Sequence, residues 1–136
     1  MRRAHWLRAI GYGLLAELST IATIVAIVLL HRYVVSKGLS DSDYAAFGDR
    51  VGGIVGIVGG TLYTFLFART LMRRLSARFI EHGVVIAVAA IALSVGGSLA
   101  GHHGVPTGYL IASLLKLAAG ASAGFIAARA SPPQPA

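Results

Sequence analysis

The stretch AIGYGLLAELSTIATIVAIVLL, residues 9–30, is apolar over a length that can cross a bilayer, and it contains a single acid, Glu17. A helix needs about 20 consecutive, mostly apolar residues to span the hydrocarbon core of a membrane. Three further runs of this kind follow, near residues 51–68, 84–100 and 109–128. The sequence therefore predicts an all-α integral membrane protein, a bundle of four transmembrane helices joined by short loops.

The overall composition also argues against an ordinary soluble domain. Of the 136 residues, 56% are hydrophobic and 12% are charged, and the mean hydropathy is +0.74. There is no cysteine, which excludes disulfides and thiolate metal sites. We expect residues 1–130 to form one membrane domain and the proline-rich residues 131–136 to be a disordered tail.

The basic residues are placed asymmetrically about the predicted spans. Eight of them lie before the first span, between the second and third spans, or after the fourth, whereas three lie in the loop that joins the first two spans. Because cytoplasmic segments are enriched in Lys and Arg, this bias predicts a bacterial-type inner membrane protein with both termini cytoplasmic. It also explains the net charge of +7 without nucleic acid as a partner.

Four of these arginines lie at or beside the second loop, where they form a predicted cytoplasmic basic patch. We interpret this patch first as a determinant of topology and second as a surface that attracts anionic lipid headgroups. Its members are Arg69, Arg73, Arg74 and Arg78. In the first outer loop, the stretch SDSDYAAFGDR, residues 40–50, carries residues that cap helices and predicts a short helix lying on the membrane surface.

Small residues recur every four positions in the second span. Such a face lets two helix backbones approach closely, which is the usual basis of helix association in lipid. Related stripes occur in the third and fourth spans, and we expect all of them to pack helices within one bundle, with self-association as the alternative. The predicted packing glycines are Gly48, Gly52, Gly56, Gly60, Gly97, Gly120 and Gly124.

Glu17 and Lys116 are the two fully charged side chains that lie well inside predicted spans. Each is on a stripe of small or polar residues, which for Glu17 includes Thr20, so we expect both to face the interior of the bundle. One interpretation is an ion pair that fixes the register of the helices. The alternative is a site that couples to protons or to a substrate.

The residues LLAE at positions 14–17 resemble a stretch of the small multidrug resistance transporters, which have four short spans and a membrane-embedded glutamate in the first. The resemblance implies that Glu17 would bind protons and cationic substrates. It covers a handful of residues, and the chain differs from that family in having Lys116 and a glycine stripe in its second span.

His31, His102 and His103 are predicted to lie at the outer surface, near the acidic residues of the first outer loop. They are the candidate metal or haem ligands, although their spacing matches no ligand motif, and we predict no cofactor. No catalytic triad or phosphate-binding loop is present, so an enzyme is not predicted. The sequence favours a structural or interaction protein, a subunit or modulator of a larger assembly, with a proton-coupled transporter as the alternative. Its expected partners are anionic lipid and a second copy or another membrane protein.

Overall fold

The computed structural model describes residues 2–101 and 107–130, with the side chains given from residue 5 onward, and it has four long helices in this part of the chain. By length and composition, each helix can cross a membrane. The prediction of an all-α, four-helix membrane bundle is therefore confirmed. The helices are α1 (Arg2–Leu30), which continues into a π-helical turn at His31–Val35, α2 (Asp41–Met72), α3 (Phe79–Ala100) and α4 (Thr107–Ala130).

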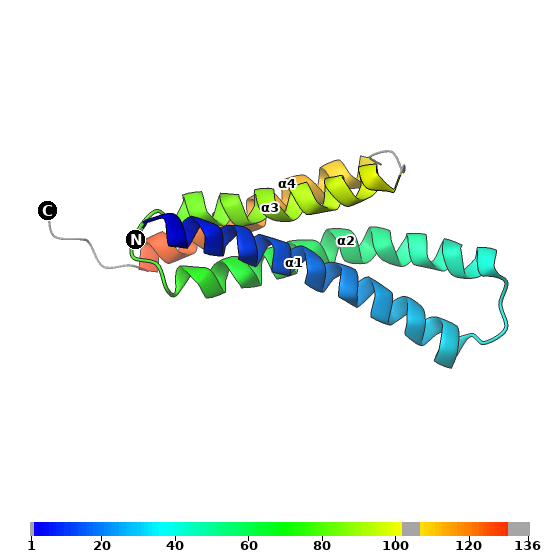
Figure 1. Cartoon of the computed structure of the whole chain (residues 1–136). Coiled ribbons are helices and arrows are strands. Elements are labelled where there is room, and N and C mark those ends of the chain that lie inside the picture. Colours follow the sequence, from blue (N-terminus) through cyan, green and yellow to red (C-terminus); the bar gives the residue numbers. More distant parts are fainter. Residues whose placement is uncertain (1, 102–106, 131–136) are drawn as a thin grey trace, which may run out of the picture.

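The helices pack in the ring order α1, α2, α4, α3, so that α1 and α4 lie on a diagonal. Figure 1 shows the start of α1, the α2–α3 loop and the end of α4 together at one end of the bundle, which we call the N/C end. Toward the opposite, far end, α1, α2 and the α3–α4 pair spread apart from one another (Figure 1). Close packing of all four helices is thus confined to the half of the bundle nearer the N/C end.

Helix α2 begins with a capping box. The Ser40 hydroxyl accepts a hydrogen bond from the Asp43 amide at 3.2 Å, and the Asp43 carboxylate accepts one from the Ser40 amide at 3.3 Å. From there the helix runs to Met72 without interruption. The predicted separate surface helix at residues 40–50 is therefore wrong, because these residues form the first turns of α2.

The physical reason is that nothing after Ser40 is able to stop the helix. A glycine such as Gly48 or Gly52 costs only about 1 kcal/mol in a helix interior, and no proline follows before the end of α2. At 1.5 Å per residue α2 is about 48 Å long, well beyond the roughly 30 Å of hydrocarbon. Part of α2 must therefore extend past the apolar layer.

The core of the bundle is built from small residues. The buried cluster consists mainly of alanines, such as Ala9, Ala68 and Ala123, together with Leu71 and Ile86. Large aliphatic side chains are mostly exposed, as expected for a surface that meets lipid tails. Packing in this protein therefore depends on close backbone contact and not on burying large side chains.

The closest backbone contact joins α3 and α4 at Gly83 and Gly120. A Cβ atom added to either glycine would overlap the carbonyl oxygen of the other, and one added to Gly120 would also lie 2.9 Å from the Gly83 carbonyl carbon. Gly124 continues this contact, since its Cβ would lie 2.6 Å from the Ile80 Cα atom. Helix α3 is also approached by α1, where Gly13 packs directly against the Ile86 carbonyl.

Other predicted packing glycines have no such neighbour. A Cβ atom added to Gly52, Gly56 or Gly97 meets no atom within 4 Å in the described part of the chain, and one added to Gly48 reaches only Val28 at 3.9 Å. For Gly52, Gly56 and Gly97, the prediction of packing inside the bundle does not hold.

The geometry of the helix explains this correction. Residues four positions apart are rotated by about 40° about the helix axis, so a stripe repeated every four residues winds around α2. The half of the stripe from Gly60 to Ala68 is buried in the bundle, whereas the Cβ positions of Gly52 and Gly56 in the far half face open space.

Candidate functional site

Three polar side chains from three helices meet inside the bundle. They are Glu17 of α1, Ser94 of α3 and Lys116 of α4. All three lie at nearly the same depth, about 22 Å from the helix ends at the N/C end. Because α1 and α4 are diagonal to each other, Lys116 reaches across the bundle to contact Glu17.

The three groups form a closed set of hydrogen bonds. Lys116 Nζ donates to Glu17 Oε2 at 2.5 Å and to Ser94 Oγ at 3.0 Å, and Ser94 Oγ donates to Glu17 Oε1. Both carboxylate oxygens are thus occupied, and the serine hydroxyl acts as donor and acceptor at once. Charge-assisted bonds of this kind are the strong class of hydrogen bond.

The ion pair is almost completely buried. Glu17 is 6% exposed and Lys116 is 3% exposed, while Ser94 is half-buried. A hollow at the N/C end and an apolar groove between α2 and α4 are both lined by other residues. An isolated buried charge would be costly, so each partner depends on the other.

Gly60 of α2 makes room for the lysine. A Cβ atom added to Gly60 would lie 2.7 Å from Lys116 Cε and 3.4 Å from Nζ. A glycine is needed at position 60 because the aliphatic part of the Lys116 side chain, which comes from α4, passes directly over it. The absence of a side chain on α2 is what lets a residue on α4 reach the diagonal helix.

Thr20 borders this cluster without joining it. It is 1% exposed, and its hydroxyl donates to the Ala16 carbonyl at 3.0 Å, within its own helix. Thr64 of α2 does the same, donating to the Gly60 carbonyl at 2.7 Å. Such bonds satisfy a buried hydroxyl locally, and Thr20 lies beside the polar cluster while its hydroxyl bond stays within α1.

Ser94 is the member of the cluster that the sequence interpretation omitted. Serine inside an apolar helix is common and carries no charge, so it gives a weak signal by itself. Its depth is the usable signal, because a hydroxyl on the third span at the same distance from the N/C end as Glu17 and Lys116 is placed to bond to both.

Of the three candidate metal ligands, His31 lies within the described residues. His31 stacks on Phe47, with ring centroids 3.7 Å apart, and meets Tyr44 edge-on at 6.3 Å. His102 and His103 lie outside the described residues. Within residues 2–101 and 107–130, no group of three or more histidine, aspartate or glutamate side chains is arranged to hold a metal ion.

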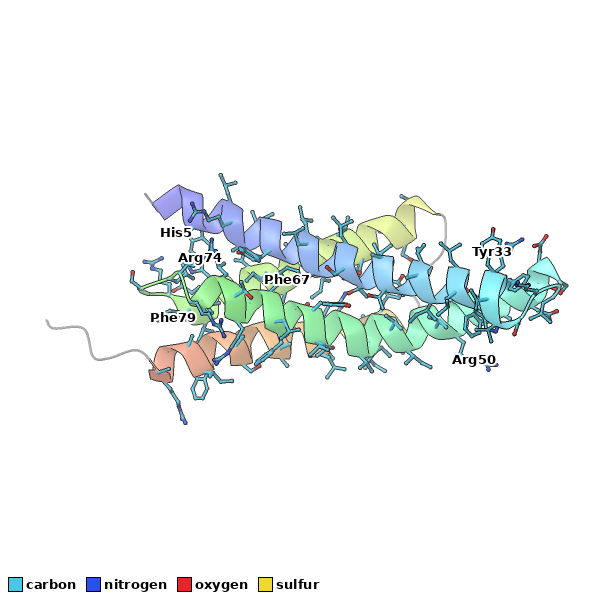
Figure 2. The ribbon with its side chains drawn as sticks, turned by 90° about the horizontal axis from the view of Figure 1, so that it is seen from below. His5, Tyr33, Arg50, Phe67, Arg74 and Phe79 are labelled. Carbon is cyan, nitrogen blue, oxygen red and sulfur yellow. The ribbon has the colours of Figure 1, made fainter. Side chains whose placement is uncertain are left out.

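The predicted basic patch is at the N/C end, together with the start of α1. Figure 2 shows Arg74 and His5 at this end, and Arg50 and Tyr33 at the far end. Arg73, Arg74 and Arg78 line the hollow there, whereas Arg69, in the last turn of α2, does not.

An ammonium, a carboxylate and a hydroxyl in mutual contact have two chemical uses. They can fix the relative positions of three helices, or they can hold a proton that is exchanged when the bundle opens. Comparisons with protein-family models, with curated proteins and with solved structures find no match. The functional argument therefore rests on the geometry of these residues.

Proposed function

We propose that this protein is a structural or interaction component of a bacterial-type inner membrane, a subunit or modulator of a larger assembly with no enzymatic activity of its own. The proposal rests on a contrast between the buried charges of the bundle and the glycine face of α2. Its buried charges are satisfied by each other, as in the Lys116–Glu17 contact at 2.5 Å, while the far half of the α2 glycine face meets no neighbour.

The polar cluster supports a structural role over proton-coupled transport. A transport site must exchange its proton or substrate with water on each side of the membrane in turn. Glu17 and Lys116 are instead closed in by helices and bonded to each other and to Ser94. A pair of this kind holds α1, α3 and α4 at one rotation and one depth.

The far half of the α2 face supports an interaction role. Gly52 and Gly56 are half-buried, and a Cβ atom at either would meet no other atom, so no side chain covers the helix backbone there. Lipid tails fill such a surface less closely than another helix does. A second copy of this chain carries the same face, so a symmetric pair of α2 helices would bury both at once. We therefore propose a second copy as the partner on this face.

Replacing Gly56 with leucine is expected to abolish this self-association and to leave the fold unchanged. The added side chain meets no atom of its own chain near its Cβ, so the fold should be retained, and helix propensity should raise the free energy of unfolding by up to about 1 kcal/mol. Between two α2 helices, the same side chain would separate the backbones. Energy transfer between differently labelled copies in proteoliposomes measures the association, and thermal unfolding of the same samples measures the fold.

Gly11→Leu is the matched control, because a Cβ atom at Gly11 also meets nothing within 4 Å but lies on α1. Its energy transfer should equal that of the wild type. If the wild type shows no energy transfer, or if the two variants lose it equally, the α2 face does not join copies of this chain.

We further propose that the N/C end is cytoplasmic, on the basis of the arginines gathered there. The chain has no cysteine, so single cysteines can report orientation without background. In spheroplasts, Lys37→Cys should react with an impermeant maleimide, whereas Ala77→Cys in the α2–α3 loop should react only after lysis. The reverse labelling pattern would contradict the proposed orientation.

A further inference from the structure

The hollow at the N/C end has a volume of about 620 Å³ and lies between the start of α1, the α2–α3 loop and the start of α3. Three arginines, two histidines and a tryptophan supply most of its chemical character, namely Arg73, Arg74, Arg78, His5, His82 and Trp6. No acidic residue is among its lining residues. The hollow is therefore a basic site with one aromatic wall.

Its positive charge is largely uncompensated. Arg78 is paired with Glu81 at 3.4 Å, an exposed contact of the kind that contributes little. Arg73 and Arg74 are exposed, and neither forms an ion pair with a carboxylate in the described part of the chain. Their guanidinium groups are free to bind an anion that enters the hollow.

Two histidines that line the hollow each have a buried ring nitrogen with no hydrogen-bond partner among the described residues. These atoms are Nε2 of His82, a residue that is 5% exposed, and Nδ1 of His5. His82 Nδ1 lies 2.8 Å from the Arg78 carbonyl oxygen, which can only accept, so Nδ1 carries the hydrogen. Nε2 of His82 is thus left to donate to an anion in the imidazolium form, or to accept from a ligand hydroxyl in the neutral form.

Two features of the backbone and the aromatic wall fit the same ligand. The Trp6 ring stacks on His82 with centroids 4.1 Å apart and planes at 12°, which fixes the histidine in place. The N-cap of α3 is Arg78 in a left-handed conformation, with φ of 58°, and it forms no side-chain cap. The start of α3 therefore lies beside the hollow, where its amide groups favour negative charge and the exposed Glu81 of its first turn offsets part of that effect.

We propose that this hollow binds a phosphate group, carried either by the headgroup of an anionic phospholipid or by a free phosphate. Guanidinium groups bind phosphate oxygens through paired hydrogen bonds, and Arg73 and Arg74 provide two that are not otherwise engaged. Nε2 of His82 supplies a further bond from the hollow's wall. This site is separate from the α2 face and does not depend on self-association.

The test uses the full chain in an uncharged detergent with Trp6 as the reporter, because it is the only tryptophan and forms part of the wall. Three probes are titrated, namely inorganic phosphate, dihexanoyl phosphatidylglycerol and dihexanoyl glycerol, which has the same chains and no phosphate. We expect saturable changes in Trp6 emission with phosphatidylglycerol and none with dihexanoyl glycerol. A response to inorganic phosphate as well identifies the phosphate group as sufficient, and its absence assigns the ligand to lipid.

Two variants distinguish binding in the hollow from general attraction of anions to a basic surface. Arg74→Gln should weaken binding about tenfold, the loss expected for a hydrogen bond to a charged group. Arg129→Gln is the matched control, because Arg129 is at the same end but lies 4.3 Å over the Phe125 ring and does not line the hollow. Its affinity should equal that of the wild type.

His82→Phe provides a second, independent variant that keeps a ring against Trp6 and removes Nε2, and it should also weaken binding. Thermal unfolding of each variant checks that the fold is retained. The proposal is overturned if no phosphate-bearing probe changes Trp6 emission, or if Arg74→Gln and Arg129→Gln lower affinity equally.

Discussion

Replacing Gly120 with alanine is expected to lower the free energy of unfolding by about 3 kcal/mol, at the upper end of the usual cost of overpacking. The new methyl group would overlap the Gly83 carbonyl oxygen and would lie 3.2 Å from the Ala87 Cβ atom. Both obstacles belong to α3 close to its axis, and a backbone cannot move aside as a flexible side chain can. Relief therefore requires α3 and α4 to separate along their whole contact.

The same substitution at Gly11 should have the opposite sign. A Cβ atom there meets nothing within 4 Å, so the effect reduces to helix propensity, which favours alanine by about 1 kcal/mol. Unfolding titrations in mixed micelles would measure both variants against the wild type. Equal stability of Gly120→Ala and Gly11→Ala would show that α3 and α4 are not in backbone contact at Gly83.

Removing either charged member of the polar cluster is expected to destabilise the protein, and removing both should restore part of the loss. Lys116→Met leaves the Glu17 carboxylate buried with only Ser94 as a partner, at a cost of about 3 kcal/mol. Glu17→Gln leaves the ammonium without its counter-charge. In the double variant neither charge is stranded, and we expect a coupling of about 1 kcal/mol, because polar contacts within membranes measured this way are modest.

The measurement is a double-mutant cycle in lipid, with thermal stability and proton flux recorded on the same proteoliposomes. For a pair that fixes helix positions, proton flux should equal that of empty vesicles in all four proteins. Strict additivity of the two substitutions would mean that the side chains do not interact. A wild-type proton flux that Glu17→Gln abolishes, and that the double variant does not recover, would instead favour transport.

The sequence predicted some members of the candidate site and not others. Glu17 and Lys116 could be paired from the sequence because a charge inside an apolar run is conspicuous and because nothing else of full charge lies at a comparable depth. The contacts of Ser94 and Gly60 with Lys116 could not be predicted in this way, since serine and glycine are common in membrane helices. Their roles follow only from the rotation of α3 and α2, which turns one hydroxyl and one bare backbone toward Lys116.

The number of spans, their order and their approximate ends are local properties of the chain. A run of apolar residues satisfies its own backbone hydrogen bonds as a helix, so its length and hydropathy decide that it crosses the membrane whatever its neighbours do. Which face of each helix is buried is not local, because in lipid no face gains by hiding from the solvent and the choice depends on how all four helices fit together. That is why the regular stripe on α2 did not reveal that Gly60 packs while Gly56 stays open, or that Gly83 and Gly120 would form the closest contact.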